Sequence, residues 1–407
     1  MTSESKSIRV CYAGLMHPAD DQRFVHKQCA ALVRAGYDVV YYAITDAKTT
    51  INGVKVYPLP KVRDLSLWKR MLEPWKLLPK LLRENCRIYH FLDPELLPLG
   101  LILKLFYKRQ VLFDAHEDYV EYARSSRHLG PARHIYACIF KLLLNLASRI
   151  FDGFVFGDDL LEKDFPHLGS RKVCFHHFPL LSMFPPSSVP FARRKYDVVY
   201  AGNLSQDKGA FDFLKTIRLL RGRCDKFRAL LIGEPRRYIR EKFYQYIGEH
   251  KLDDCLEVTG HLPYKEVSGL LDECKVGLIG LLDLPKFRKQ SATKLFEYMA
   301  KALPVVSADL PPERKYMTSG VHGYLVRPGD PQTMADAVYD IITNPELGGK
   351  MAKACREQVI DKQLYAEKDC EKLLAFYDYI LTHPRFAKHK NTLLKSPGSE
   401  AESIAEK

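Results

Sequence analysis

The chain has 407 residues, 46% of them hydrophobic, which suits about two globular domains with sizeable cores. Its formal net charge of +13 favours polyanionic partners: phosphorylated substrates, anionic lipid or nucleic acid. The ten cysteines include no Cys-x-x-Cys pair, and we take them as isolated from histidine, which argues against a zinc site and for a reducing cytosol. Without a signal-peptide pattern or an apolar run of about 18 residues, we expect a cytoplasmic protein that does not span a membrane.

The chain opens with the order strand, loop, helix, strand. A buried strand is predicted over residues 8–13, followed by Gly14, a helix over 24–35 and a strand over 38–43. This order is typical of an α/β fold with a parallel sheet. No Gly-x-Gly-x-x-Gly motif is present here, which argues against a standard dinucleotide site. Arg23 in the loop is either a surface cap or a ligand for phosphate.

Residues 61–87 differ in composition from the rest of the chain. They hold both tryptophans, Trp68 and Trp75, and eight basic residues against three acidic ones. A basic amphipathic stretch with tryptophan suits a helix lying on anionic lipid. Pro74 and Pro79 divide the stretch into short pieces, so an internal helix with a solvated basic face is the alternative.

Two predicted strands lead into polar residues. The strand over 88–92 precedes Asp93, and the strand over 111–115 precedes His116 and Glu117. Open α/β sheets bind ligands at the carboxyl ends of their strands. His116 is therefore a candidate for ligand contact, with a hydrogen-bonded loop histidine as the alternative. The remaining elements of the first half are a helix, a strand and a short helix, over 135–148, 153–157 and 160–165.

The second half repeats the α/β pattern after a proline- and serine-rich linker. A strand over 196–202 is followed by Asn203, Lys208 and a helix, and such a loop can hold a diphosphate. Further strands are predicted over 228–233, 256–260, 276–279 and 305–306, and helices over 264–272, 293–301, 332–343, 345–364 and 365–381. From residue 387 the chain is polar and free of aromatic residues, so we expect disorder.

The helix over 293–301 carries Lys294 and Glu297, three residues apart and so on one face near the N-terminus. Free N–H donors and the helix dipole make that end suitable for a phosphate. A carboxylate one turn further suits a pair of sugar hydroxyls. The alternative is a solvated surface ion pair.

The sequence KLFEYMAKALPVV over 294–306 resembles the signature helix of family 4 glycosyltransferases, retaining enzymes of the GT-B fold. HPADDQRFVHK, YHFLDPELLPLGL and FDAHEDY resemble a subset of that family, and the likeness covers roughly residues 8–380. It implies two Rossmann-like domains facing a cleft. The expected parts are a first domain over 1–180, a linker over 181–195, a second domain over 196–364, a helix over 365–386 that crosses back to the first domain, and a tail over 387–407.

The resemblance implies transfer of a sugar from a UDP- or GDP-linked donor to a glycan or lipid-diphosphate-linked acceptor in cell-surface polysaccharide biosynthesis, with no cofactor and no dedicated metal. It implies that Glu297 holds the ribose, that His116 reaches the donor sugar and that Lys208 stabilises the diphosphate. The other implied donor-side residues are Gly14, Asn203, Leu262, Lys289 and Lys294. The implied acceptor-side residues are Arg23, Asp93 and Glu117.

This chain departs from the family pattern at two positions. Lys289 stands where the family usually has a glutamate, and Asn203 stands where it has an arginine. A GT-B nucleotide-sugar epimerase and a scaffold that binds nucleotide without turnover are therefore alternatives. We expect no nucleic-acid partner, because no recognised module accompanies the charge. The positive charge and the tryptophans suggest a peripheral position on the inner face of the cell membrane.

Overall fold

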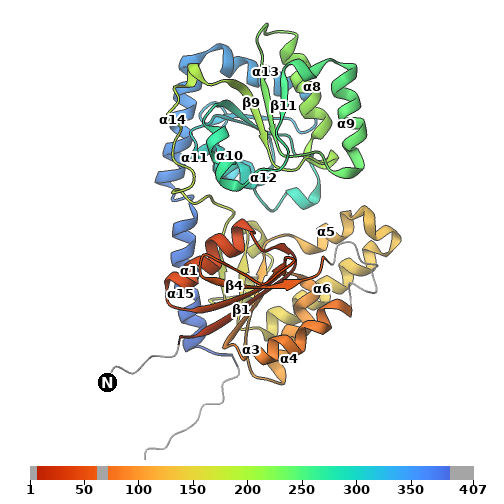
Figure 1. Cartoon of the computed structure of the whole chain (residues 1–407), viewed down its shortest axis with the longest axis vertical. Helices are drawn as coiled ribbons and strands as arrows, with labels where there is room; N and C mark the ends of the chain where they lie inside the picture. The colour runs from red at the N-terminus through yellow and green to blue at the C-terminus, as the bar shows by residue number, and fades with distance from the viewer. Residues whose placement is uncertain (1–6, 62–71, 386–407) are drawn as a thin grey trace, which may run out of the picture.

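The computed structural model describes residues 7–61 and 72–385, which form two sheets with helices on both faces (Figure 1). The first sheet has eight strands in the order β3-β4-β2-β1-β5-β6-β7-β8, parallel except for the β3–β4 hairpin. The second has six parallel strands in the order β11-β10-β9-β12-β13-β14. The fold is thus α/β with two Rossmann-like halves.

The strands of the first sheet are β1 Arg9–Pro18, β2 Asp38–Ile44, β3 Thr49–Ile51, β4 Val54–Leu59, β5 Ile88–Phe91, β6 Gln110–Ala115, β7 Gly153–Phe156 and β8 Lys172–Cys174. The helical segments in this half are η1 Gln22–Cys29, α1 Ala30–Arg34, η3 Glu73–Leu77, α3 Leu78–Glu84, η4 Pro94–Leu96, α4 Leu97–Leu105, α5 Tyr119–Ser125, η5 Arg127–Ala132, α6 Arg133–Ile150, α7 Asp159–Glu162 and η6 Pro166–Leu168.

The strands of the second sheet are β9 Tyr196–Ala201, β10 Ala229–Ile232, β11 Leu256–Val258, β12 Cys274–Ile279, β13 Val305–Ala308 and β14 Gly323–Val326. The helical segments from residue 191 onward are η7 Phe191–Arg193, η8 Gln206–Lys208, α8 Ala210–Arg221, α9 Arg237–Glu249, η9 Leu252–Asp254, α10 Tyr264–Leu271, η10 Pro285–Phe287, α11 Thr293–Ala300, α12 Pro311–Tyr316, α13 Pro331–Thr343, α14 Pro345–Asp361 and α15 Ala366–Thr382.

β1 shows why the predicted strands are continuously apolar. Val10 and Tyr12 pack in the core on one face of the sheet, and Cys11 and Ala13 pack in the core on the other. A strand covered on both faces has no solvent side, so its sequence does not alternate between apolar and polar residues.

The last helix lies against the first sheet, although it follows the second along the chain (Figure 1). The Tyr377 hydroxyl of α15 donates to the Tyr12 hydroxyl at 3.0 Å and lies 2.8 Å from His90 Nδ1. A Cβ on Gly153 would lie 2.4 Å from the Phe376 ring, so the absence of a side chain on β7 lets α15 approach. α15 is therefore part of the core of the first half.

Several elements differ from the sequence predictions. β1 runs to Pro18, five residues beyond its predicted end, because its last residue pairs with Ile44 of β2. The helix expected over 24–35 begins as a π-helix, η1, whose N-cap Asp21 accepts hydrogen bonds from two backbone N–H groups. The predictions contained no elements at β3, β4, β8, β14, α4, α5, α9 or α12.

The basic segment over 61–87 is only partly described. Trp68 lies outside the described residues, as does the polar tail over 387–407. Between residues 72 and 84 the chain forms two short pieces, η3 and α3, as the prolines predict. Leu81 of α3 is buried in the core of the first half, whereas Trp75 is exposed. No helix within residues 7–61 and 72–385 is both long and apolar enough to cross a membrane.

Candidate functional site

Glu297 on α11 is a buried carboxylate rather than half of a surface ion pair. The residue is 7% exposed, and its Oε1 accepts a hydrogen bond of 2.7 Å from the Tyr264 hydroxyl. Burial raises the pKa of Glu297, while the Tyr264 bond and the nearby Lys27 and Lys294 oppose that rise. The surface-pair alternative is therefore wrong, and Tyr264 is a residue of this site that the sequence did not indicate.

Two lysines with lowered pKa values belong to this site: Lys294 lies near the carboxylate, and Lys208 lies near Lys294. Lys294 Nζ lies 3.3 Å from the centroid of the Tyr200 ring, a cation–π contact. Burial lowers the pKa of Lys294 well below its usual value, and Lys208 lowers it further. Burial also lowers the pKa of Lys208, against the effect of Glu117 from the first half. Two desolvated ammonium groups in mutual repulsion favour an anionic ligand.

The loop that carries Lys208 depends on glycine. Gly209 begins α8 with φ of 75°, and a Cβ there would lie 2.0 Å from the carbonyl oxygen of Gly280. Asn203, one of the predicted donor-side residues, is exposed in the same loop. Leu262, another, is half-buried before α10 and packs against the core. The loop thus delivers Lys208 to the N-terminal end of α8, where the helix dipole favours an anion.

His116 occupies the end of β6, on the first-half side of the site. The residue is buried, and its Nδ1 lies 3.0 Å from the Tyr119 hydroxyl and 3.3 Å from Asp114 Oδ1. Its ring contacts those of His17 and Phe24 edge to face, with centroids 5.0 and 5.2 Å away. The imidazole is therefore held in one place by neighbours from three segments of the chain.

Arg23 holds Asp114, the carboxylate that contacts His116, in place. The guanidinium is 5% exposed, and its Nη2 donates to both oxygens of Asp114 at 3.0 and 3.2 Å. A further bond joins it to the carbonyl oxygen of Phe175. Burial alone would raise the pKa of Asp114, but Arg23 and His116 hold it well below its usual range. The expectation of a surface arginine is wrong. Arg23 acts on His116 through Asp114 and is enclosed rather than open to an acceptor.

Asp93 also holds backbone in place. Its Oδ2 accepts from the N–H groups of Leu15 and Met16 at 2.6 and 3.2 Å. Burial alone would lower the pKa of the adjacent His17, but Asp93 and Asp21 raise it to about 10. Gly14 is buried in the same turn, where a Cβ would lie 3.0 Å from a Leu92 methyl group. Asp93 therefore fixes the end of β1 rather than standing exposed on the acceptor side.

Lys289 joins the two halves of the chain. Its ammonium pairs with Asp164 and lies 3.4 Å from Asp118 Oδ2, both of them in the first half. Burial alone would lower the pKa of Lys289, but these two carboxylates raise it. The ammonium is thus bound to protein carboxylates, in contrast to the prediction that it binds the donor. The sequence could not indicate this, because its partners lie more than a hundred residues away.

The two residues after Lys289 continue this junction. Gln290 Nε2 donates to the carbonyl oxygen of His116 at 2.6 Å and lies 2.7 Å from His177 Nε2. Ser291 donates to Asp158 Oδ2 from both its backbone N–H and its hydroxyl, at 3.3 and 3.2 Å. The segment that leads into α11 and Glu297 is therefore bonded directly to the segment that carries His116.

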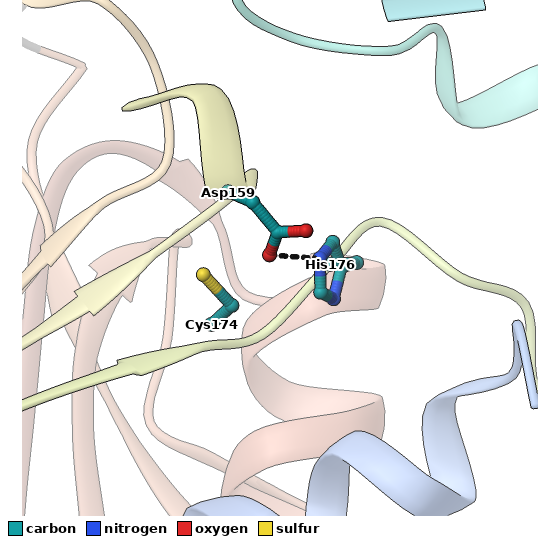
Figure 2. Close-up of side chains that lie close together, drawn as sticks. All are labelled: Asp159, Cys174 and His176. Atoms are coloured by element: carbon teal, nitrogen blue, oxygen red, sulfur yellow. Dashed lines mark hydrogen bonds and ion pairs between the residues drawn. The ribbon is translucent and has the colours of Figure 1, made fainter. Parts of the chain in front are cut away.

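A second polar cluster lies where the chain leaves the first sheet (Figure 2). Asp159, Cys174 and His176 bring their donor atoms within 4.8 Å of one another, close enough for a metal ion. His176, however, lies 2.9 Å from both Asp159 Oδ1 and Asp369 Oδ2. Burial alone would lower its pKa, but these carboxylates raise it to about 9. A protonated imidazole has no lone pair for a metal.

We therefore interpret this cluster as an ion-pair network that ties three parts of the chain together. Lys315 of α12 pairs with Asp159 of α7, and Asp369 belongs to α15. Cys174 Sγ donates to Glu162 at 2.8 Å. The treatment of the cysteines as isolated from histidine was wrong, because Cys174 precedes His176 by two residues. That spacing was a readable signal in the sequence.

Comparison with known proteins finds a similar family for part of the chain. Residues 195–344 match the family model described as glycosyl transferases group 1. The chain is 24% identical to the 2-deoxystreptamine N-acetyl-D-glucosaminyltransferase of Niallia circulans over 170 residues, 42% of each chain. It is 26% identical to the putative colanic acid biosynthesis glycosyltransferase WcaL of Salmonella typhimurium over 198 residues, 45% of this chain and 47% of WcaL. The matches thus span less than half the length of these relatives.

A solved structure extends the likeness to nearly the whole chain. HepE of Anabaena, crystallised in complex with UDP and glucose, superposes with a TM-score of 0.70 at 14% identity, covering 91% of this chain and 100% of that one. At this identity the likeness shows the fold alone. Together these findings show a chain with the GT-B fold whose residues 195–344 are similar to the glycosyl transferases group 1 family.

Proposed function

We propose that the chain is a nucleotide-sugar-dependent glycosyltransferase that moves a sugar to a glycan or lipid-diphosphate-linked acceptor in cell-surface polysaccharide biosynthesis. The observation that carries the proposal is the buried Glu297 carboxylate near Lys294, which in turn lies near Lys208. The names of the curated relatives support sugar transfer, and UDP in the HepE complex favours a UDP-linked donor.

In this proposal each part of the site has one task. Lys208, Lys294 and the N-terminal end of α8 neutralise the diphosphate as it leaves, which lowers the barrier to breaking the sugar–phosphate bond. Glu297, fixed by Tyr264, accepts hydrogen bonds from the ribose hydroxyls. His116 contacts the donor sugar from the other half of the chain. The bonds of Gln290 and Ser291 bring the two halves together around the donor and exclude water.

The charge of the two lysines supports a reaction without a dedicated metal ion. Retention of configuration at the transferred carbon rests on the resemblance to family 4 glycosyltransferases. A peripheral position on the inner face of the cell membrane follows from a lipid-linked acceptor and the net charge of +13.

Thermal unfolding with a panel of UDP-, GDP- and ADP-sugars tests the donor site. A donor at about 100 times its Kd stabilises the folded chain by about 2.7 kcal/mol. We expect a rise in Tm with one nucleotide class, abolished by Glu297→Ala and preserved in Glu346→Ala, which removes an exposed glutamate of α14. NMR of the transferred sugar then reports retention or inversion.

Other outcomes distinguish the alternatives. The absence of a Tm shift with every donor contradicts the proposal. A shift without transfer to any acceptor favours a nucleotide-binding scaffold, for which Lys289 and Asn203 would be the reason. Isomerisation of the donor sugar without an acceptor favours an epimerase.

A further inference from the structure

Helix α6 has two apolar faces, and only one of them packs against the protein. Ala137, Leu144 and Ala147 are buried against the first sheet. The opposite face carries Ile135, Ile139, Leu142 and Leu146, which are 64, 37, 68 and 42% exposed. Their spacing of four, three and four residues places them along one side of the helix. Four large aliphatic side chains aligned in solvent mark an interaction surface.

The end of α4 extends this surface. α4 packs against α6, and Lys104 of α4 pairs at 2.7 Å with Asp152, just beyond the C-terminal end of α6. The next three residues, Leu105, Phe106 and Tyr107, are all exposed. In Figure 1 both helices lie on the side of the first half away from α15. We call these seven exposed side chains, four on α6 and three at the end of α4, the α6 face.

The charged residues of α6 itself are all positive. Residues 126–150 contain no aspartate or glutamate. Lys141 and Arg149 are exposed on the flanks of the aliphatic side chains, and exposed Lys108 follows Tyr107. Within the described part of the chain none of these three forms an ion pair. Aliphatic side chains flanked only by cations complement a bilayer with anionic headgroups. Pairing with a second copy would instead bring these cations together across a two-fold axis.

The α6 face is also connected to the candidate site. The chain runs from His116 through Glu117 and Asp118 into α5, and α5 packs against both α6 and η10 of the second half. A bilayer on the α6 face would therefore lie beside the segment that carries His116. An acceptor held in that bilayer by a lipid could reach the site without leaving it.

We propose that the α6 face docks the protein on an anionic lipid bilayer. The docking deepens the proposed function, on which the lipid-linked nature of the acceptor rests. It assigns membrane binding to α6 rather than to the tryptophan segment, since Leu81 anchors α3 in the core. The aliphatic side chains enter the headgroup boundary, and Lys108, Lys141 and Arg149 bind lipid phosphates.

Flotation of the full chain with vesicles tests the proposal. We expect binding to equimolar phosphatidylglycerol and phosphatidylcholine, weakening as salt is raised, and no binding to phosphatidylcholine alone. The double variant Ile139→Ser, Leu142→Ser should lower the bound-to-free ratio at least about tenfold. The matched control Tyr238→Ser, Tyr244→Ser removes two exposed aromatic side chains from α9 and should bind like wild type.

Three outcomes overturn the proposal. The first is equal vesicle binding by the α6 variant and wild type, and the second is loss of vesicle binding in Trp75→Ala alone. The third is a wild-type dimer in sedimentation that dissociates in the α6 variant. The α6 variant should keep the wild-type Tm and the donor-induced Tm shift, because its changed side chains are exposed and far from Glu297 in the fold. Loss of the donor shift in wild type contradicts the proposed function but leaves vesicle binding unaffected. The two proposals therefore fail separately.

Discussion

At the scale of single residues, the bond between Tyr264 and Glu297 makes a prediction about pH. The hydroxyl bond lowers the pKa of a carboxylate that burial raises. Tyr264→Phe should therefore raise that pKa further, so that donor binding, which needs the ionised carboxylate, begins at higher pH. A charged hydrogen bond contributes about 1.5–3 kcal/mol, which corresponds to a shift of one pH unit or more. Donor Kd measured by calorimetry between about pH 5 and pH 8 reports the shift.

Tyr324→Phe is the control for this prediction, since it breaks a tyrosine–aspartate bond on the surface of the second half. A superimposable pH profile for Tyr264→Phe and wild type would mean that Glu297 does not bind the donor as a carboxylate.

Residue-level prediction from the sequence succeeded where the partners are close along the chain. The three-residue spacing of Lys294 and Glu297 correctly placed both on one face of a helix. Tyr264 was missed because it lies 33 residues from Glu297. The carboxylates that bind Lys289 were missed for the same reason, and no local pattern reports a contact between the two halves. Burial, which turns Glu297 from a surface group into a candidate ligand, is a property of the fold.

At the scale of elements, the loop between β9 and α8 is constrained by the close approach of Gly209 to the residue that follows β12. Gly209→Ala puts a Cβ at positive φ and within 2.0 Å of the Gly280 carbonyl oxygen. The left-handed backbone alone costs about 1 kcal/mol, and the contact adds to it, so unfolding free energy should fall by at least about 2 kcal/mol. Gly222→Ala at the other end of α8, with φ of −68° and only ordinary van der Waals contacts for a Cβ, should change stability by less than about 1 kcal/mol.

Urea unfolding of the two glycine variants, with the donor-induced Tm shift as a second measurement, checks this expectation. Equal stability of Gly209→Ala and Gly222→Ala would show that the loop can move away from β12. If Gly209→Ala also kept the donor-induced Tm shift, Lys208 would need no fixed loop to bind the diphosphate.

Elements were predicted well where an apolar run or a helical repeat was long. β9, β12 and α11 lie within one or two residues of their predicted bounds. Strands β3, β8 and β14 have only three or four residues, too few for a pattern to stand out. Helix α9 was missed although Ile239, Phe243 and Ile247 repeat every four residues. The π-helical start of η1 has no recognised sequence signal.

At the scale of the whole molecule, three groups with raised pKa values contribute stability that falls with rising pH, whereas the lowered pKa values of Lys294 and Lys208 act in the opposite direction. Burial raises the pKa of Glu313 to about 8, while carboxylates overcome burial to raise those of His176 and His17 to about 9 and 10. Each folded-state pKa exceeds its unfolded value, so the folded chain binds more protons. The histidine contributions are complete below about pH 6.5 and are lost as pH rises through 9 to 10.

Scanning calorimetry of wild type and His176→Gln at intervals from pH 6 to pH 9.5 isolates one of these groups. His176→Gln should have a lower Tm than wild type at pH 6, and the difference should shrink as pH rises, because the variant lacks the protonated imidazole. His134→Gln, which changes an exposed histidine of α6, should follow the wild-type curve. A His176→Gln curve parallel to wild type would contradict the network around His176.

The ion pairs of Lys289 also limit how the two halves can be exchanged in evolution. A second half taken from a relative with the usual glutamate at this position would set three carboxylates against one another, with Asp118 and Asp164 supplied by the first half. In such a recombinant, repulsion among these three carboxylates would destabilise the junction beside His116. We therefore expect a substitution at position 289 to be tolerated only together with changes at positions 118 and 164.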